Sequence, residues 1–235
     1  HTIDLGDFTN PHGIAWMPDG DRVAVTSESS GNVVLVSIGE RRVVGNIPTQ
    51  ARGSHMLAVT ADGRSIWTGD MASHTVTELD VGSMEKVRSF PAPATPEAVN
   101  VTPDGSIVFA GSNDTGRVTA FDSSDGSTRV VAEGFGWPYR IFPTPGVEQI
   151  LIPDLENEVL RFFDGSDYGE LGSIGFPGEG PQGLTLHPDG RHLFLSLSRA
   201  GRIAVVDIHS REVVGYLPAG VGPDGIGYSP LTVTR

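Results

Sequence analysis

Six polar residues recur along the chain at nearly constant spacing, and their side chains are of types that carry chemistry. Successive members are 43, 42, 42, 43 and 42 residues apart. The set contains two imidazoles, two carboxylates, a phenol and an amide, which can bind a ligand through hydrogen bonds and charge. In chain order these residues are His12, His55, Glu97, Tyr139, Gln182 and Asp224.

Part of this set has the chemistry of metal ligands. Imidazole and carboxylate groups bind Zn²⁺, Mn²⁺ and Fe²⁺, carboxylates also bind Ca²⁺, and a metal with open positions can polarise a carbonyl or activate water. If the chain closes on itself, the last member of the set lies beside the first. The candidate metal ligands are then His12, His55, Glu97 and Asp224. The alternative is that exposure to solvent alone explains six polar residues at such positions.

Two further residues near the fourth member could take part in binding or catalysis. Arg140 follows Tyr139 directly, and its planar guanidinium suits an anionic substrate group. Trp137 lies just upstream in a glycine-rich loop and could provide an aromatic wall for a ligand. The candidate catalytic residues are His12, His55, Tyr139 and Arg140.

The elements that position these residues belong to a repeat of about 42 residues. In the first copy, four short apolar runs cover residues 13–17, 22–27, 32–37 and 42–47, separated by turn residues such as Pro-Asp-Gly at 18–20. Val, Ile, Leu and Phe fill the runs, as is typical of strands, and no amphipathic helix is evident. Four strands in a repeat of this length predict an all-β fold of the β-propeller class.

The repeat resembles the YVTN family of propeller repeats and, more loosely, NHL and lactonase-type propellers. The resemblance is carried by the Pro-x-Gly-hydrophobic-Ala opening at 11–15, the Pro-Asp-Gly turn and the alternating strand that ends in Asp122 or Asp207. The Tyr-Val-Thr-Asn tetrapeptide itself is replaced, for example by Val-Thr-Ser at 25–27. The resemblance implies an extracytoplasmic protein that binds a partner, although propellers of this type often have seven blades.

We expect a single domain, residues 1–235, of about six four-stranded blades. Five blades cover about 11–53, 54–95, 96–137, 138–180 and 181–222. The sixth combines residues 223–235 with residues 1–10, so both termini close it. Because these two pieces are short, we expect this last blade to be incomplete.

Composition excludes several classes of function. The chain has 29 acidic and 16 basic residues, a net charge of −13, which disfavours nucleic acid as a partner. It has no cysteine, which excludes disulfides and thiolate chemistry, and no apolar run of the ~20 residues that a membrane helix needs. The first residues do not look like a signal peptide, so a secreted, periplasmic or surface location implies one removed before this sequence begins. We expect a monomer.

Two hypotheses for function follow. The first is a binding protein that holds a small molecule, a peptide or an envelope partner at the mouth of the central channel. The alternative is a metal-assisted hydrolase or lyase, similar to propeller lactonases and streptogramin lyases, that uses the His/His/Glu/Asp set.

Overall fold

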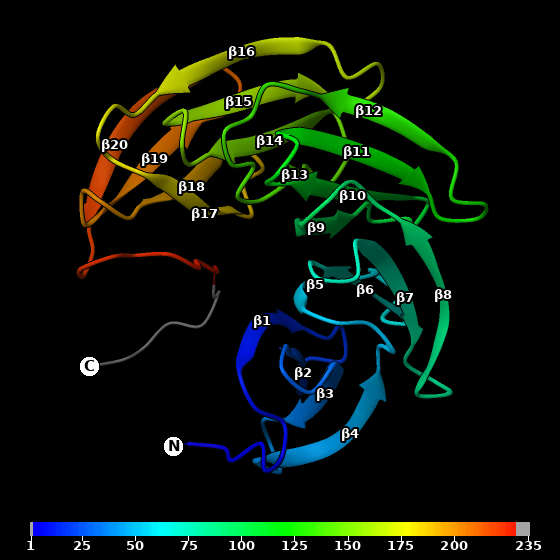
Figure 1. The fold of residues 1–235 in the computed structure, drawn as a ribbon. Coiled ribbons are helices and arrows are strands. Elements are labelled where there is room, and N and C mark those ends of the chain that lie inside the picture. The colour runs from blue at the N-terminus through cyan, green and yellow to red at the C-terminus, as the bar shows by residue number, and fades with distance from the viewer. Residues whose placement is uncertain (1, 229–235) are drawn as a thin grey trace. The chain divides into compact units, whose positions relative to one another are not determined.

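The computed structural model of the protein describes residues 2–228, which form strands and turns. Within that range there is no helix of the length and apolarity needed to span a membrane. The chain divides into two compact units, His1–Phe135 and Gly136–Arg235. Both contain four-stranded antiparallel sheets in which each strand pairs with its neighbour in sequence (Figure 1). We number these sheets in chain order as blades 1 to 5.

The first unit holds blades 1 to 3. Blade 1 consists of β1 (Pro11–Trp16), β2 (Arg22–Ser27), β3 (Asn32–Ser37) and β4 (Arg42–Pro48). Blade 2 consists of β5 (Ser54–Val59), β6 (Ser65–Asp70), β7 (Thr75–Asp80) and β8 (Glu85–Pro91). Blade 3 consists of β9 (Pro96–Val101), β10 (Ile107–Ser112), β11 (Arg117–Asp122) and β12 (Thr128–Ala132). The first strands of the three blades, β1, β5 and β9, lie next to one another.

The second unit holds blades 4 and 5. Blade 4 consists of β13 (Phe142–Pro143), β14 (Gln149–Asp154), β15 (Val159–Asp164) and β16 (Glu170–Gly175). Blade 5 consists of β17 (Pro181–Leu186), β18 (His192–Leu197), β19 (Arg202–Asp207) and β20 (Glu212–Pro218).

The strand pattern predicted for the first repeat is confirmed, because each strand of blade 1 begins and ends within two residues of its predicted bounds. The turn chemistry is also as expected. Gly20, Gly63, Gly105 and Gly190 end the four Pro/Ala-Asp-Gly turns with φ of 70–76°, a region that costs glycine little.

The predicted number of about six blades is corrected to five for residues 2–228. Residues 2–10 and 219–228 form no strand, and the remaining parts of the predicted sixth blade, residue 1 and residues 229–235, lie outside the described residues. The N-terminal piece packs through its side chains instead. Leu5, with Ile3 and Phe8, lies against buried valines of blade 1. In the same way Phe90 of β8 packs against blade 3. Phe90 lies six residues before the first residue of β9, as Leu5 lies six residues before the first residue of β1.

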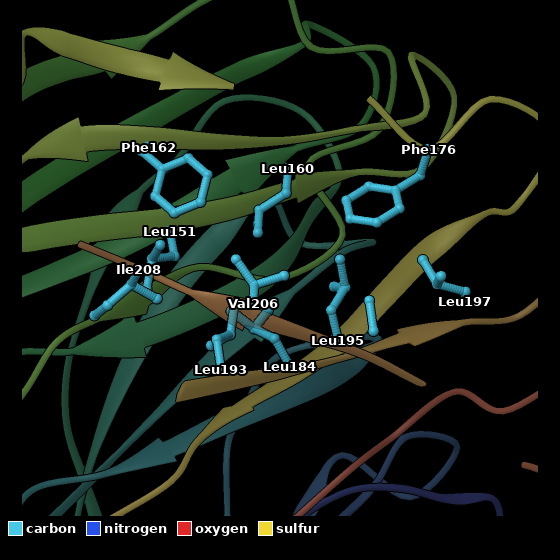
Figure 2. Packing of buried hydrophobic residues seen from close by; sticks show 11 residues of the cluster. Leu151, Leu160, Phe162, Phe176, Leu184, Leu193, Leu195, Leu197, Val206 and Ile208 are labelled. Atoms are coloured by element: carbon cyan, nitrogen blue, oxygen red, sulfur yellow. The ribbon is translucent and has the colours of Figure 1, made fainter. Parts of the chain in front are cut away.

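The core lies between the faces of neighbouring blades. Blade 1 packs on blade 2 through residues such as Leu35 and Leu79, and blade 2 packs on blade 3 through Trp67 and Phe121, all essentially buried. In the second unit, Figure 2 shows leucine and phenylalanine side chains of blades 4 and 5 interdigitating. Each such fully buried side chain contributes about 1.5–3 kcal/mol. This packing fixes where the first strand of each blade begins.

Blade 4 departs from the repeat. Its first strand has two residues, where β1, β5, β9 and β17 have six each. The preceding residues form an irregular loop that meets the sheet at an isolated bridge between Pro138 and Asp154. The strand expected to begin at 138 is therefore replaced by a loop.

Candidate functional site

In blades 1, 2, 3 and 5 the polar residue of the repeat lies at a β-bulge near the start of the first strand. On β5, His55 lies between Ser54 and Met56. The partners of those two residues, Asp70 and Gly69, are consecutive on β6, so His55 has no partner in the ladder. A bulge of this kind turns the side chain away from the regular alternation of the strand. The same irregularity marks His12, Glu97 and Gln182.

In blades 1 and 5, a buried hydroxyl ties the bulge to the next repeat. The N–H of Gly13 donates to Thr26 Oγ1 at 2.7 Å, and that hydroxyl donates to the His55 carbonyl oxygen at 2.7 Å. A Cβ on Gly13 would lie only 2.9 Å from the same carbonyl, so glycine permits the close approach. In the second unit, Ser196 Oγ donates in the same way to the Asp224 carbonyl oxygen at 2.6 Å. Backbone contacts, and not side-chain chemistry alone, therefore set these positions.

In the first unit, the His55 imidazole lies between two carboxylates. His55 Nδ1 is 3.5 Å from Glu28 Oε2, and Nε2 is 3.7 Å from Glu97 Oε1. The side chains of His55 and Glu97 are only 13% and 5% exposed. Each of the two ring nitrogens of His55 therefore faces a different carboxylate.

Each carboxylate also accepts a hydrogen bond from an asparagine amide. Asn10 Nδ2 donates to Glu28 Oε2 at 2.9 Å, and Asn113 Nδ2 donates to Glu97 Oε2. The result is a chain of amide, carboxylate, imidazole, carboxylate and amide groups that runs across the beginnings of three blades.

His12 completes the group. Its ring stacks on that of His55 with centroids 3.6 Å apart, and the residue is exposed. The three predicted residues of the first unit are thus brought together. We call the following residues the imidazole cluster: Asn10, His12, Glu28, His55, Glu97 and Asn113.

The predicted residues of the second unit form a separate group. The Tyr139 hydroxyl donates to Asp224 Oδ2 at 3.0 Å, although Tyr139 is largely buried. The Arg140 guanidinium lies 4.4 Å from the Tyr139 ring centroid, and its Nη1 donates to the Tyr139 carbonyl at 2.7 Å. The Trp137 ring is 6.0 Å from that of Tyr139. Gln182, at its bulge on β17, is partly buried.

A buried carboxylate holds the loop that carries Tyr139. Asp154, at the end of β14, accepts the backbone N–H groups of Gly136 and Trp137 at 2.9–3.1 Å. It also accepts both N–H donors of Asn157, from the backbone and from Nδ2. Asp154 is fully buried, so this set of donors is what makes its position possible.

The predicted metal site is not seen as a cluster in the part of the chain that the structure describes, and with Asp224 in the other unit it stays a prediction. No group of three or more histidine or carboxylate side chains among residues 2–228 is arranged to hold a metal ion. The physical reason lies at His55, whose two nitrogens face different carboxylates and so do not converge with them on one point. Because Asp224 belongs to the other unit, the six-residue ring as a whole stays a prediction.

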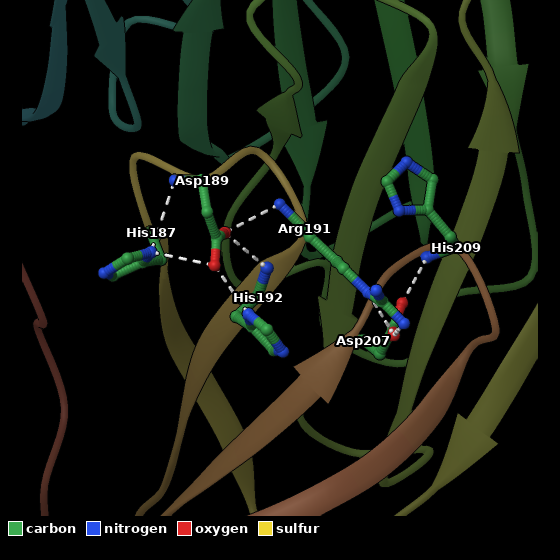
Figure 3. Close-up of polar contacts among 6 residues, drawn as sticks. All are labelled: His187, Asp189, Arg191, His192, Asp207 and His209. Atoms are coloured by element: carbon green, nitrogen blue, oxygen red, sulfur yellow. Dashed lines mark hydrogen bonds and ion pairs between the residues drawn. The ribbon is translucent and has the colours of Figure 1, made fainter.

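Blade 5 carries a further histidine–carboxylate group, shown in Figure 3, that sequence reasoning left unpaired. His187 and His192 both direct Nδ1 at Asp189 Oδ2, at 3.0 and 2.6 Å. The hydrogen bond from His192, together with backbone N–H groups, holds the pKa of Asp189 well below its ordinary value. Arg191 pairs in turn with Asp207. These contacts brace the Pro-Asp-Gly turn of blade 5, which is a structural role.

Three residues of the imidazole cluster are not among the residues predicted for the site: Asn10, Glu28 and Asn113. Glu28 and Asn113 follow the second strands of blades 1 and 3 at the same repeat position. That shared position was the available signal, because the end of the second strand lies beside the start of the first in an antiparallel pair.

Comparison with known proteins establishes the fold of the chain and not its family. No family model and no curated protein sequence matches the chain, so the resemblance to YVTN repeats stays a prediction. Solved structures do match. Virginiamycin B lyase from Staphylococcus aureus aligns with a TM-score of 0.76 and 16% identity, over 92% of this chain and 72% of that one. Hydrazine synthase from Kuenenia stuttgartiensis aligns with a TM-score of 0.70 and 14% identity, over 95% of this chain and 91% of that one. The chain therefore has a β-propeller fold built from four-stranded antiparallel blades.

Proposed function

We propose that the protein is a binding protein whose imidazole cluster holds a small polar molecule where the first strands of blades 1 to 3 begin. The observation that carries this proposal is His55, an imidazole held between two carboxylates from neighbouring blades and covered by the exposed ring of His12. The proposal also places the protein outside the cytoplasm, because of its resemblance to YVTN repeats. It places the bound molecule at the mouth of the propeller channel.

The free-energy cost of burying the polar groups of the cluster supports a functional role for it. Burying a carboxylate and an imidazole costs free energy unless both are paired, and apolar side chains at these positions would pack without that cost. The bulges and the Thr26 hydroxyl hold the two groups in place before a ligand arrives. Such preorganisation lowers the entropy that binding consumes.

A ligand screen tests the proposal. Saturation-transfer NMR on mixtures of amines, alcohols, acids and sugars is expected to identify binders. Titration with these binders should then shift the ring-proton signals of His12 and His55. The variants His12→Ala and His55→Ala should weaken those binders at least tenfold, whereas His209→Ala, on the turn that follows β19, should not. Binders that are indifferent to both cluster variants, or a screen that yields none, would refute it.

A second candidate is a lyase, favoured by the exposed imidazole of His12 lying on a ring that is paired with acids. His12 would take a proton from a carbon of the substrate, the electron pair would form a double bond, and the bond to the leaving group would break. The fold shared with virginiamycin B lyase supports this candidate at the level of architecture. Incubation with virginiamycin B, followed by chromatography, should then show a product that His12→Ala does not form.

A further inference from the structure

The amide groups of the imidazole cluster have fixed orientations. A carboxylate only accepts hydrogen bonds, so Asn113 must turn its Nδ2 group toward Glu97. The Oδ1 atom on the other side of the same amide is then an acceptor whose direction is set. Asn113 Oδ1 is buried and has no hydrogen-bond partner among the described residues. It therefore calls for a donor.

The opposite end of the cluster repeats this arrangement. Asn10 Nδ2 donates to Glu28 Oε2 at 2.9 Å, so the Asn10 Oδ1 atom also points away from the carboxylate as an acceptor. The cluster thus combines two negative carboxylates with two amide oxygens. A third carboxylate, Asp114, follows Asn113 directly and is held by the Thr95 hydroxyl at 2.6 Å.

We infer that the imidazole cluster selects ligands that carry a protonated amine, an inference that rests on the proposed binding function. An alkylammonium group has three N–H donors and a positive charge, which matches a site made of carboxylate and amide oxygens. A carboxylate ligand would face like charges at Glu28 and Glu97. A neutral alcohol would gain one donor but none of the charge attraction.

A series of three probes with the same four-carbon chain tests the inference: n-butylammonium, n-butanol and butyrate. NMR titration of the full chain follows the side-chain amide signals of Asn10 and Asn113. Asn32 and Asn46, which hydrogen-bond to each other on blade 1, provide reference signals. We expect n-butylammonium to shift the Asn10 and Asn113 signals saturably and leave the reference pair unchanged, and the other two probes to bind at least tenfold more weakly.

Charge-neutralising variants sharpen the test. Glu97→Gln can still accept from Asn113 but removes the charge, so n-butylammonium should bind at least tenfold more weakly. Glu28→Gln, at a more exposed position, gives the same test if the first variant fails to fold. Glu40→Gln is the matched control, because Glu40 pairs with Arg42 on the exposed side of blade 1.

The inference is overturned if butyrate or butanol binds as tightly as n-butylammonium, or if both glutamine variants bind it unchanged. Butyrate or butanol shifting the cluster signals would leave the proposed binding function standing and remove only the choice of ligand. If none of the three shifts them, the amine inference fails, and the wider screen judges the binding function.

Discussion

Blades 2 and 4 both have a buried carboxylate at the same repeat position, but it stabilises a regular strand in blade 2 and an irregular loop in blade 4. Asp70 and Asp154 each end the second strand of their blade, and both are fully buried. Around Asp70 the donors are four side-chain hydroxyls, and the blade is regular. They belong to Ser54, Thr68, Thr75 and Thr77. Around Asp154 three of the donors are backbone N–H groups, and the first strand is replaced by a loop.

The difference shows how one position can support either regular or irregular backbone. A hydroxyl can rotate to donate or to accept, so the surroundings of Asp70 adapt to a change in their partner. A backbone N–H can only donate, so the loop of blade 4 depends on a strong acceptor at Asp154. Blade 4 thereby gains the freedom to present Tyr139 and Arg140 from a loop.

The largest expected effect comes from replacing the two carboxylates by amides. Asp154→Asn turns an NH₂ group toward N–H donors that cannot reverse, and we expect it to lower the free energy of unfolding by about 3 kcal/mol. Asp70→Asn should cost about 1 kcal/mol, because the surrounding hydroxyls can rotate to accept. Urea denaturation measures both values.

Hydrogen–deuterium exchange gives the local check on this pair. Exchange at residues 136–141 should rise in Asp154→Asn, while exchange in blade 2 should stay close to wild type in Asp70→Asn. Equal losses of stability in the two variants would show that hydroxyl and backbone donors are interchangeable here, and the comparison would fail.

An intermediate effect is expected at the turn that follows the first strand. Val147 of blade 4 has φ of 56°, where the equivalent Gly63 of blade 2 has φ of 70°. Positive φ strains a β-branched residue by roughly 1 kcal/mol. We expect Val147→Gly to stabilise the protein by about 1 kcal/mol, raising Tm by about 2–4 °C, and Gly63→Val to destabilise it. Calorimetry showing a lower Tm for Val147→Gly would contradict this account.

The smallest expected effect concerns the acids that end the third strands. The pKa of Asp164 in blade 4 lies below its ordinary value of 3.8, first because the Ser166 hydroxyl donates to it, whereas backbone donation from Ser83 is the main cause at Asp80 in blade 2. Ser166→Ala should therefore raise the pKa of Asp164 more than Ser83→Ala raises that of Asp80. NMR titration of the carboxyl carbons measures both, and equal shifts would contradict the assignment.

The sign of the pH dependence follows from the lowered pKa values. Because Asp80 and Asp164 are more acidic in the folded protein than in the unfolded chain, they stabilise the fold above pH 3.8. That stabilisation is lost as the pH falls further and the folded carboxylates take up protons. Ser166→Ala should reduce this loss slightly.

The fold could largely be predicted because short sequence patterns determine its strands and turns. Apolar runs and Pro-Asp-Gly turns depend on neighbours in sequence, and they gave the strands of blade 1 within two residues. The loop at the start of blade 4 could not be predicted, because it depends on Asp154, a partner 17 residues away from Trp137 that looks like any acid after a strand. The prediction of a sixth blade was wrong for a related reason. Leu5 has the spacing and packing of a strand residue, but residues 2–10 form no strand.

The candidate site was predicted only in part. The spacing brought His12, His55 and Glu97 together correctly, because the bulge recurs at the same place in blades 1 to 3. The spacing could not show that Glu28 and Asn113 complete the cluster, or that His55 directs its nitrogens in opposite directions. Those facts depend on side-chain rotamers set by packing in three dimensions.

The N-terminal segment has a consequence for how repeats are searched for in such chains. Leu5 occupies the place that Phe90 fills elsewhere, although the described residues around it form no strand. An apolar contact can therefore keep its place where no backbone ladder surrounds it. A search for further copies is better based on the spacing of buried side chains than on hydrogen-bond patterns.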